Sequence, residues 1–245
     1  MAAEHIIKSY DEELGRLSKM IVEMGGLAES QLAAASEVVM QRDSDRAIRV
    51  VEGDAQVDQL ERDLDNLAIR LLALRQPMAR DLREIVAALK IASDLERICD
   101  YAANVAKRSI ALAQTPPIQP VQSLPRMTRL ALLLVKDVID AYVARDADKA
   151  YAVWVRDEEL DEMYASLFRV LLTYMMEDPR NIGPCTHLLF IAKNIERIGD
   201  HATNIAENVY YLVHGTPLEE ARPKGDKSSL EIVARERPPS SAGAG

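Results

Sequence analysis

Apolar residues recur at alternating spacings of three and four along residues 57–74, a pattern that predicts one long amphipathic helix. This helix is expected to begin at Asp45, since Asp43 and Ser44 directly precede that residue and can cap its start. Gln76-Pro77 ends it, because the residue before a proline is pushed out of the α region. A further helix is expected from Met78 to about Leu112, and an earlier one from about Glu4 to Gln41. Gly25-Gly26 should weaken or bend the earlier helix.

The chain contains an internal repeat. Residues 91–106 match residues 191–206, with nine of sixteen positions identical, and Arg42-Asp-Ser-Asp45 matches Arg145-Asp-Ala-Asp148. The offset changes only from 100 to 103 between these two matches, so the halves differ by small changes in loop length. We therefore expect a duplicated unit of three helices.

This repeat predicts an all-α protein built as a tandem repeat of two three-helix bundles. The first repeat spans residues 1–115 and the second spans 116–215, with a proline-rich linker from Thr115 to Pro125 that is too poor in donors to be helical. Helices are expected over about 124–144, 146–177 and 181–214. Residues 216–245, rich in Pro, Gly, Ser, Lys and Glu, are predicted to form a disordered C-terminal tail.

Composition agrees with a helical protein and narrows its partners. Only 10 Gly and 11 aromatic residues occur among 245, fewer than a β-sandwich or barrel of this length needs. The net charge of -9 argues against a protein that binds the phosphate backbone of a nucleic acid, so we expect no nucleic-acid partner. The longest apolar run, of about six residues, is too short for membrane insertion. Two cysteines, no CxxC and no secretory signal at the N-terminus predict a cytoplasmic location.

The residues that could carry chemistry are pairs of carboxylates spaced four positions apart. Such pairs lie one above the other on a helix and repel each other, so a base or a cation should offset them. Oxygen ligands of this kind suit Mg, Mn or iron. Each half carries two pairs, on its second and third helices; the eight candidate metal ligands are Asp54, Asp58, Glu96, Asp100, Asp157, Asp161, Glu196 and Asp200.

The helical wheel places Glu96 and Asp100 nearly opposite Leu95 and Ile98, so we expect the carboxylates to face outward. Solvated acidic faces that aid solubility are the simpler interpretation of any one pair. Four pairs kept in two otherwise divergent halves favour a cation-binding role. Cys99, where the other half has Gly199, is expected to be a small, partly buried filler.

Enzymatic alternatives fit the sequence less well. A buried dinuclear carboxylate oxidase needs Glu-x-x-His on two helices, and no His follows a Glu at that spacing. Neither a Gly-x-Ser-x-Gly elbow nor a phosphate-binding Gly-rich loop is present. The sequence therefore predicts no enzymatic activity and no catalytic residue.

Several segments resemble the PhoU family of phosphate-signalling proteins, in both halves and in order up to about Gly215. They are Arg75-Gln-Pro-Met-Ala-Arg-Asp-Leu-Arg83, Leu95-Glu-Arg-Ile-Cys-Asp-Tyr-Ala102, Asp178-Pro-Arg-Asn-Ile182 and His187-Leu-Leu-Phe-Ile-Ala-Lys-Asn-Ile-Glu-Arg-Ile-Gly-Asp-His-Ala-Thr-Asn-Ile-Ala-Glu207.

The resemblance implies a homodimer that regulates the phosphate-starvation response negatively. The implied partners are the ATPase subunit of the phosphate ABC transporter and the sensor histidine kinase of the phosphate regulon. It also implies surface metal ions (Mg, Mn, Zn or Fe) on the eight carboxylates given above. Cys99 departs from the glycine usual in the first motif, so the metal there is left open.

Two other functions remain open at this stage. One is an accessory protein of a phosphate permease, and the other is a metal-dependent enzyme of phosphate chemistry.

Overall fold

The computed structural model describes residues 2–75 and 77–219, and within them it contains helices and no strand. This confirms the predicted all-α fold with two repeated bundles. The helices follow the chain in this order: α1 (Ala2–Gln41), α2 (Ser44–Glu52), α3 (Asp54–Arg75), α4 (Arg80–Ala113), the 3-10 helix η1 (Gln119–Ser123), α5 (Leu124–Ala144), α6 (Ala147–Glu177), the 3-10 helix η2 (Pro179–Asn181) and α7 (Ile182–His214).

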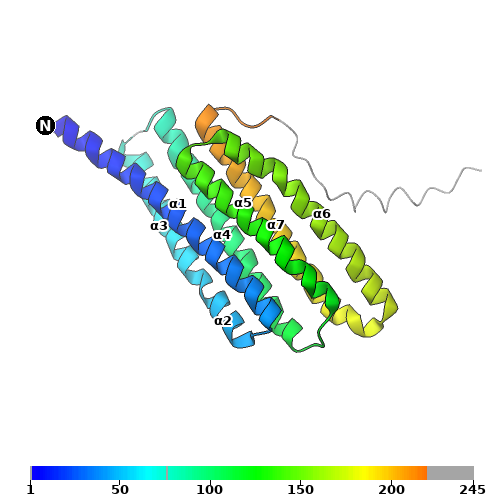
Figure 1. Ribbon diagram of the computed structural model, residues 1–245. Helices are drawn as coiled ribbons and strands as arrows, with labels where there is room; N and C mark the ends of the chain where they lie inside the picture. The colour runs from blue at the N-terminus through cyan, green and yellow to red at the C-terminus, as the bar shows by residue number, and fades with distance from the viewer. Residues whose placement is uncertain (1, 76, 220–245) are drawn as a thin grey trace, which may run out of the picture.

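Four helices form the centre of the molecule, and the remaining ones flank it. Helices α1, α4, α5 and α7 pack against one another, with α4 and α7 joining the two halves. Helices α2 and α3 cover one side of this bundle, and α6 covers the other (Figure 1). The flanking helices, α2 and α3 in the first half and α6 in the second, each lie against the third helix of their own repeat.

The helix ends follow the predicted local rules. Asp43 adopts an extended conformation before α2, and its side chain accepts a hydrogen bond from the backbone N–H of Arg46 at 2.9 Å. Asp146 caps α6 in the same way, by accepting from the N–H of Lys149 at 2.9 Å. These equivalent caps start the second helix of each repeat, because an aspartate there satisfies an N–H that the helix leaves unpaired.

Two expectations about continuity were wrong, those for the second helix of the first half and for the linker, whereas the single helix expected from about Glu4 to Gln41 is confirmed. The second helix of the first half breaks at Gly53 into α2 and α3. Helix α1 runs through Gly25-Gly26 without interruption; Gly25 packs against α5, where an added Cβ would lie 2.9 Å from the side chain of Ile139. The linker between the halves is not free of helix, since residues 119–123 form η1 with a proline in its first turn.

The described part of the tail is short. Leu218 packs, partly buried, against the hydrophobic core. The rest of the segment predicted to be disordered, from residue 220 on, lies outside the described residues. None of the described helices is long and apolar enough to cross a membrane.

Candidate metal centre

In the second half the acidic residues lie between α6 and α7. Asp157 and Asp161 project from α6, and Glu196 and Asp200 from α7. The exposed fractions of Asp157, Asp161 and Glu196 are only 1%, 4% and 5%. The prediction that the carboxylates face outward is therefore wrong for these three. The acidic side of α7 is turned away from the central bundle, and α6 covers it there.

Gly199 lets α6 come this close to α7. A Cβ built on Gly199 would overlap Asp157 Oδ1 and lie 2.6 Å from Leu160 Cδ2. The missing side chain thus allows the Asp157 carboxylate to lie directly against the backbone of α7. A glycine inside a helix is usually unfavourable, so its presence here is explained by this close approach.

The first half has the same arrangement with more solvent access. Asp54 and Asp58 on α3 and Glu96 and Asp100 on α4 are all half-buried, neither outward-facing nor enclosed. Cys99 occupies the position equivalent to Gly199 and is completely buried, whereas the sequence predicted partial burial. Its side chain occupies the position at which, in the other half, Asp157 and Leu160 lie against the backbone of Gly199.

The enclosed carboxyl groups have perturbed acidities. Burial, followed by the effects of the charges of Asp200 and Asp161, raises the pKa of Glu196 to about 7, against the opposing hydrogen bond from Lys193. Burial and the charge of Asp100 raise the pKa of Glu96 to about 7 as well. A bound cation would lower both values, because it favours the charged form of a nearby carboxylate.

Burial, then the charges of Asp54 and Glu96, also shift the pKa of the Cys99 thiol far upward. The thiolate that binds metals or attacks electrophiles is therefore disfavoured. Cys99 acts as a packing residue beside the acids and not as a soft ligand.

Basic side chains already contact both clusters. In the first half, Arg97 Nε lies 3.5 Å from Glu96 Oε2, and Arg97 Nη1 lies 3.3 Å from Asp100 Oδ2. In the second half, Lys193 Nζ donates to Glu196 Oε1 at 2.7 Å. Glu196 Oε2 is buried and has no hydrogen-bond partner among the described residues. The second cluster therefore retains a carboxylate oxygen that could bind a cation beyond this ion pair.

Sequence reasoning missed two residues of this region, Glu61 and Lys193. Glu61 follows Asp58 by three positions on α3, and its pKa is raised by burial and by the charges of Asp65 and Asp58. Lys193 precedes Glu196 by three positions on α7. A spacing of three positions from an acid of the cluster, which places two side chains on the same side of a helix, would have identified both. The internal repeat does not mark either residue, because Glu61 corresponds to Tyr164 in the second half and Lys193 corresponds to Ser93 in the first.

The donor set fits a hard cation, although it is not prearranged for one. In residues 2–75 and 77–219, no three His, Cys, Asp or Glu side chains converge in an arrangement that could hold a metal ion. The carboxylates of each cluster nevertheless come from two neighbouring helices, and oxygen ligands of this type suit Mg, Mn or iron. The orphaned Oε2 of Glu196 points to the same chemistry. Binding a metal thus requires the carboxylates to turn toward one another.

His201, which follows Asp200 in the sequence, takes part in the contact between the halves. Its Nδ1 lies 2.8 Å from Asp94 Oδ1 on α4, and Asn204 Nδ2 donates to the same oxygen at 3.1 Å. The ring of Tyr101 lies 5.5 Å from the imidazole, centroid to centroid. This histidine therefore joins α7 to α4.

The fold and the site together define a class: a duplicated helical protein in which each half carries a carboxylate cluster between its second and third helices. The PhoU domain family model matches the chain over residues 21–109 and again over 124–209. Because the matched residues make up well over half of the chain, the protein belongs to the PhoU family, which confirms the resemblance found in the sequence.

Named relatives and solved structures agree with this family assignment. The chain is 51% identical to the phosphate-specific transport system accessory protein PhoU homolog of Caulobacter vibrioides, over 91% of this chain and 97% of the relative. It is 50% identical to the homolog of the same name in Rhizobium meliloti, over 94% and 97%. The crystal structure of PhoU from Pseudomonas aeruginosa superposes with a TM-score of 0.81 at 40% identity, covering 84% of this chain and 100% of that one.

Proposed function

We propose that this protein is a cytoplasmic negative regulator of the phosphate-starvation response. It acts as a homodimeric adaptor that connects the ATPase subunit of the phosphate ABC transporter to the sensor histidine kinase of the phosphate regulon. The observation that carries this proposal is the match to relatives called phosphate-specific transport system accessory proteins, which extends through both halves and over more than nine-tenths of the chain.

The role is non-enzymatic. What supports this is the state of the groups that could do chemistry: His201 is engaged with Asp94, and the Cys99 thiol is completely buried with its pKa shifted upward. The clusters instead resemble binding sites, since their carboxylates lie between helices, buried in the second half and half-buried in the first, and repel one another. A divalent or iron cation there would join α3 to α4, or α6 to α7, and so set the spacing of helices within each half.

The regulatory claim is tested by deleting the gene and measuring a phosphate-scavenging reporter in phosphate-rich medium. We expect the reporter to be switched on in the deletion strain and silenced again by the wild-type gene. A reporter that stays silent in the deletion strain rejects the regulatory role.

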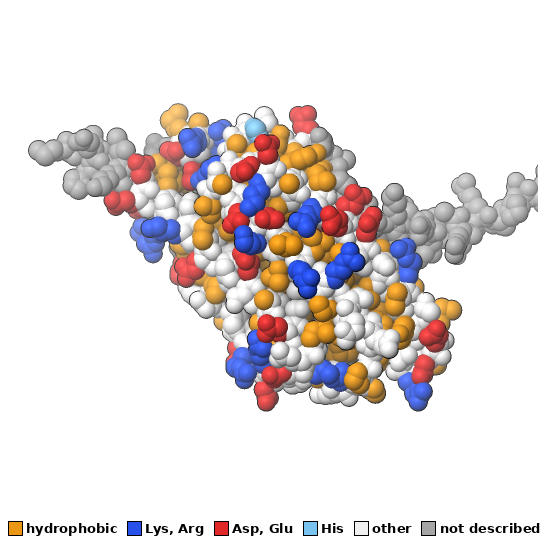
Figure 2. Space-filling view, viewed as in Figure 1, with side chains coloured by type: hydrophobic (Ala, Val, Ile, Leu, Met, Phe, Trp, Pro, Cys, Tyr) orange, Lys and Arg blue, Asp and Glu red, His pale blue; other side chains and the backbone are white. Residues whose placement is uncertain are grey.

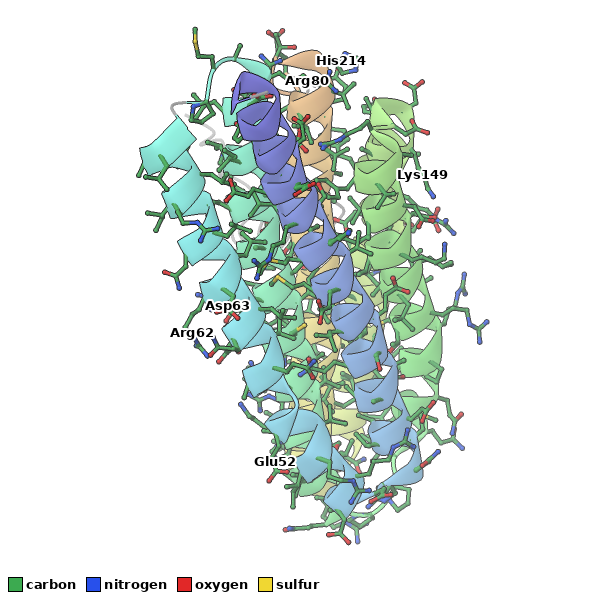
Figure 3. The ribbon with its side chains drawn as sticks, turned by 90° about the vertical axis from the view of Figure 1, so that its left-hand side faces the viewer. Glu52, Arg62, Asp63, Arg80, Lys149 and His214 are labelled. Carbon is green, nitrogen blue, oxygen red and sulfur yellow. The ribbon has the colours of Figure 1, made fainter. Side chains whose placement is uncertain are left out.

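The metal-carrying claim is tested by complementing the same strain with Asp58→Asn. Asp63→Asn is the matched control, because Asp63 lies one turn further along α3 and is exposed on its outer side, beside Arg62 (Figure 3). We expect Asp63→Asn to silence the reporter fully and Asp58→Asn to silence it only in part. Equal silencing by the two variants would return Asp58 to the role of a solubilising surface acid.

The partner and assembly claims need purified protein. We expect light scattering to give twice the mass of the chain, and the protein to co-purify with the cytoplasmic part of the kinase. A monomer in solution would reject the homodimer, and capture by the transporter ATPase alone would reject the link to the kinase.

A further inference from the structure

Exposed apolar side chains gather at the turn that joins α3 to α4. Met78 is 80% exposed and Leu74 is 71% exposed, and Leu82, at the start of α4, is exposed as well. Figure 2 shows hydrophobic and basic side chains next to one another at this end of the molecule. Exposed apolar patches mark interaction surfaces, and methionine suits them because its flexible side chain adapts to the shape of a partner.

The same turn presents a positive charge. Arg80 is exposed and forms no ion pair among the described residues. The acids beside it offer little compensation, because Glu84 pairs with Arg145 and Asp81 is half-buried. Ala79 adopts a φ of 45°, a conformation that is rare for a residue with a Cβ atom and costs energy. A strained backbone that presents Met78 and Arg80 to solvent favours a functional role for this turn.

A groove on the outer face of α6 is also partly apolar. Its volume is about 510 Å³, and Tyr151 and Val155 line it. The ring of Tyr151 stacks on that of Trp154, with 5.7 Å between the centroids, and the indole is buried. One wall of the groove is therefore held in place by the core. Tyrosine, methionine and arginine are enriched at protein interfaces, so the groove and the turn have the composition of two matching halves of an interface.

The charge of the groove is opposite to that of the turn. Three glutamates line it, and the basic residue among them, Arg156, has its Nε 3.9 Å from Glu159 Oε1. The other two, Glu158 and Glu162, are exposed and form no ion pair within the described part of the chain. Figure 2 shows acidic side chains along α6. The groove thus complements the turn in charge as well as in polarity.

We propose that the turn between α3 and α4 of one copy of the chain docks into the groove on α6 of a second copy. This inference rests on the homodimer of the proposed function and adds the interface that forms it. Both surfaces lie toward the same end of the bundle, since Figure 3 places Arg80 there together with Lys149 of the first turn of α6. A two-fold axis at this end brings each turn to the other copy's groove, so the contact forms twice and the assembly closes as a dimer.

The crossed contact is the pairing that the charges favour. Turn against turn would bring Arg80 of the two copies together, and groove against groove would bring the glutamates of the two copies together. Like charges facing each other across an interface are costly. In the crossed arrangement Arg80 of each copy faces Glu158 and Glu162 of the other.

The test is sedimentation equilibrium of the full-length protein, which measures the dissociation constant of the dimer. We expect Arg80→Glu and Glu162→Arg each to raise that constant by about 10- to 100-fold, because each change places like charges at both contacts. The two variants, once mixed, should bind each other more tightly than either binds itself, since both contacts of the mixed dimer again join opposite charges. Met78→Ser, which removes the apolar contact, should raise the constant by about 10-fold.

Arg62→Glu and Glu52→Arg are the matched controls. They reverse the same charges at exposed positions on α3 and at the end of α2, away from both surfaces (Figure 3). Neither should change the dissociation constant. Arg80→Glu is compatible with folding, because an acid in the first turn of a helix is favourable, and Glu158→Arg provides a second variant on the groove side.

The inference is overturned if the wild-type protein is a dimer and the variants of the turn and the groove change its dissociation constant no more than the controls do. The homodimer would then stand with another interface. It is also overturned if these variants stay dimeric but no longer co-purify with the cytoplasmic part of the kinase, because the turn would then bind a different protein. A monomeric wild-type protein would reject the inference and the homodimer together, while the reporter experiment would still decide the regulatory role.

Discussion

Gly199→Ala tests whether close packing of α6 on α7 creates the enclosed acidic site. The added methyl group would overlap Asp157 Oδ1 and come within 2.6 Å of Leu160 Cδ2. Ordinary carbon contacts lie near 3.5–4.0 Å, so α6 must retreat by about 1 Å. Asp157 cannot swing aside into solvent, because its side chain is enclosed between the two helices.

The expected loss of stability follows from two opposing effects. Inserting a methyl group into a well-packed interior costs about 1–3 kcal/mol, and two simultaneous overlaps place Gly199→Ala near the upper end. Replacing glycine by alanine inside a helix returns about 1 kcal/mol. We therefore expect the free energy of unfolding to fall by about 2 kcal/mol, an estimate that rests on these two typical values.

The assay is urea unfolding followed by the fluorescence of Trp154, the single tryptophan. It is buried on α6 and donates to Glu207 of α7 at 3.0 Å, so it reports on the same pair of helices. Gly26→Ala is the control, since Gly26 is exposed inside α1 with open space around it. That variant should gain about 1 kcal/mol. If Gly199→Ala is also stabilised, α6 does not depend on the missing side chain and the packing argument is refuted.

Three further predictions concern acidity, the thiols and a helix end. With a chelator present, the melting temperature should fall as the pH rises from about 4.5 to about 7, because Glu96 and Glu196 have pKa values raised to about 7 and keep protons that the unfolded chain has released. Adding Mn²⁺ should reduce this fall. A melting temperature that does not change with pH in chelator would contradict the burial of these acids. Both cysteines are buried, so iodoacetamide should modify them only after unfolding, as mass spectrometry would show; rapid labelling of the native protein would contradict this. Arg42 donates hydrogen bonds to two backbone carbonyls at and just after the end of α4, so Arg42→Ala should lower the free energy of unfolding, measured in urea, by about 2 kcal/mol. Arg62 is exposed, and Arg62→Ala should change this free energy little. Equal effects of the two substitutions would contradict the capping role of Arg42.

The internal repeat and the apolar spacing were enough to predict the all-α fold and most helix ends. They failed at Gly53, which precedes the apolar pattern of residues 57–74 and separates α2 from α3. Gly25-Gly26 does not interrupt α1, although glycine is a weak helix former. Here α5 packs against that position, and tertiary contact outweighs helix propensity.

The acidic residues show a different limit of sequence reasoning. A helical wheel orders the side chains of one helix around its own axis, but it contains no information about the helix alongside. On that basis Glu196 belongs to the solvent side of α7, yet α6 lies there and reduces its exposed fraction to 5%. The internal repeat also gives no signal for Glu61 and Lys193, because neither residue recurs at the equivalent position of the other half.

The most direct test of the claim that the carboxylate clusters bind a metal ion is the anomalous diffraction of crystals grown with Mn²⁺, recorded near the manganese absorption edge. The proposed metal-carrying role predicts a strong peak at one or both carboxylate clusters, within coordination distance of oxygens from Asp58 and Glu96 or from Asp161 and Glu196. A peak only outside the two carboxylate clusters, or none at all, would contradict it.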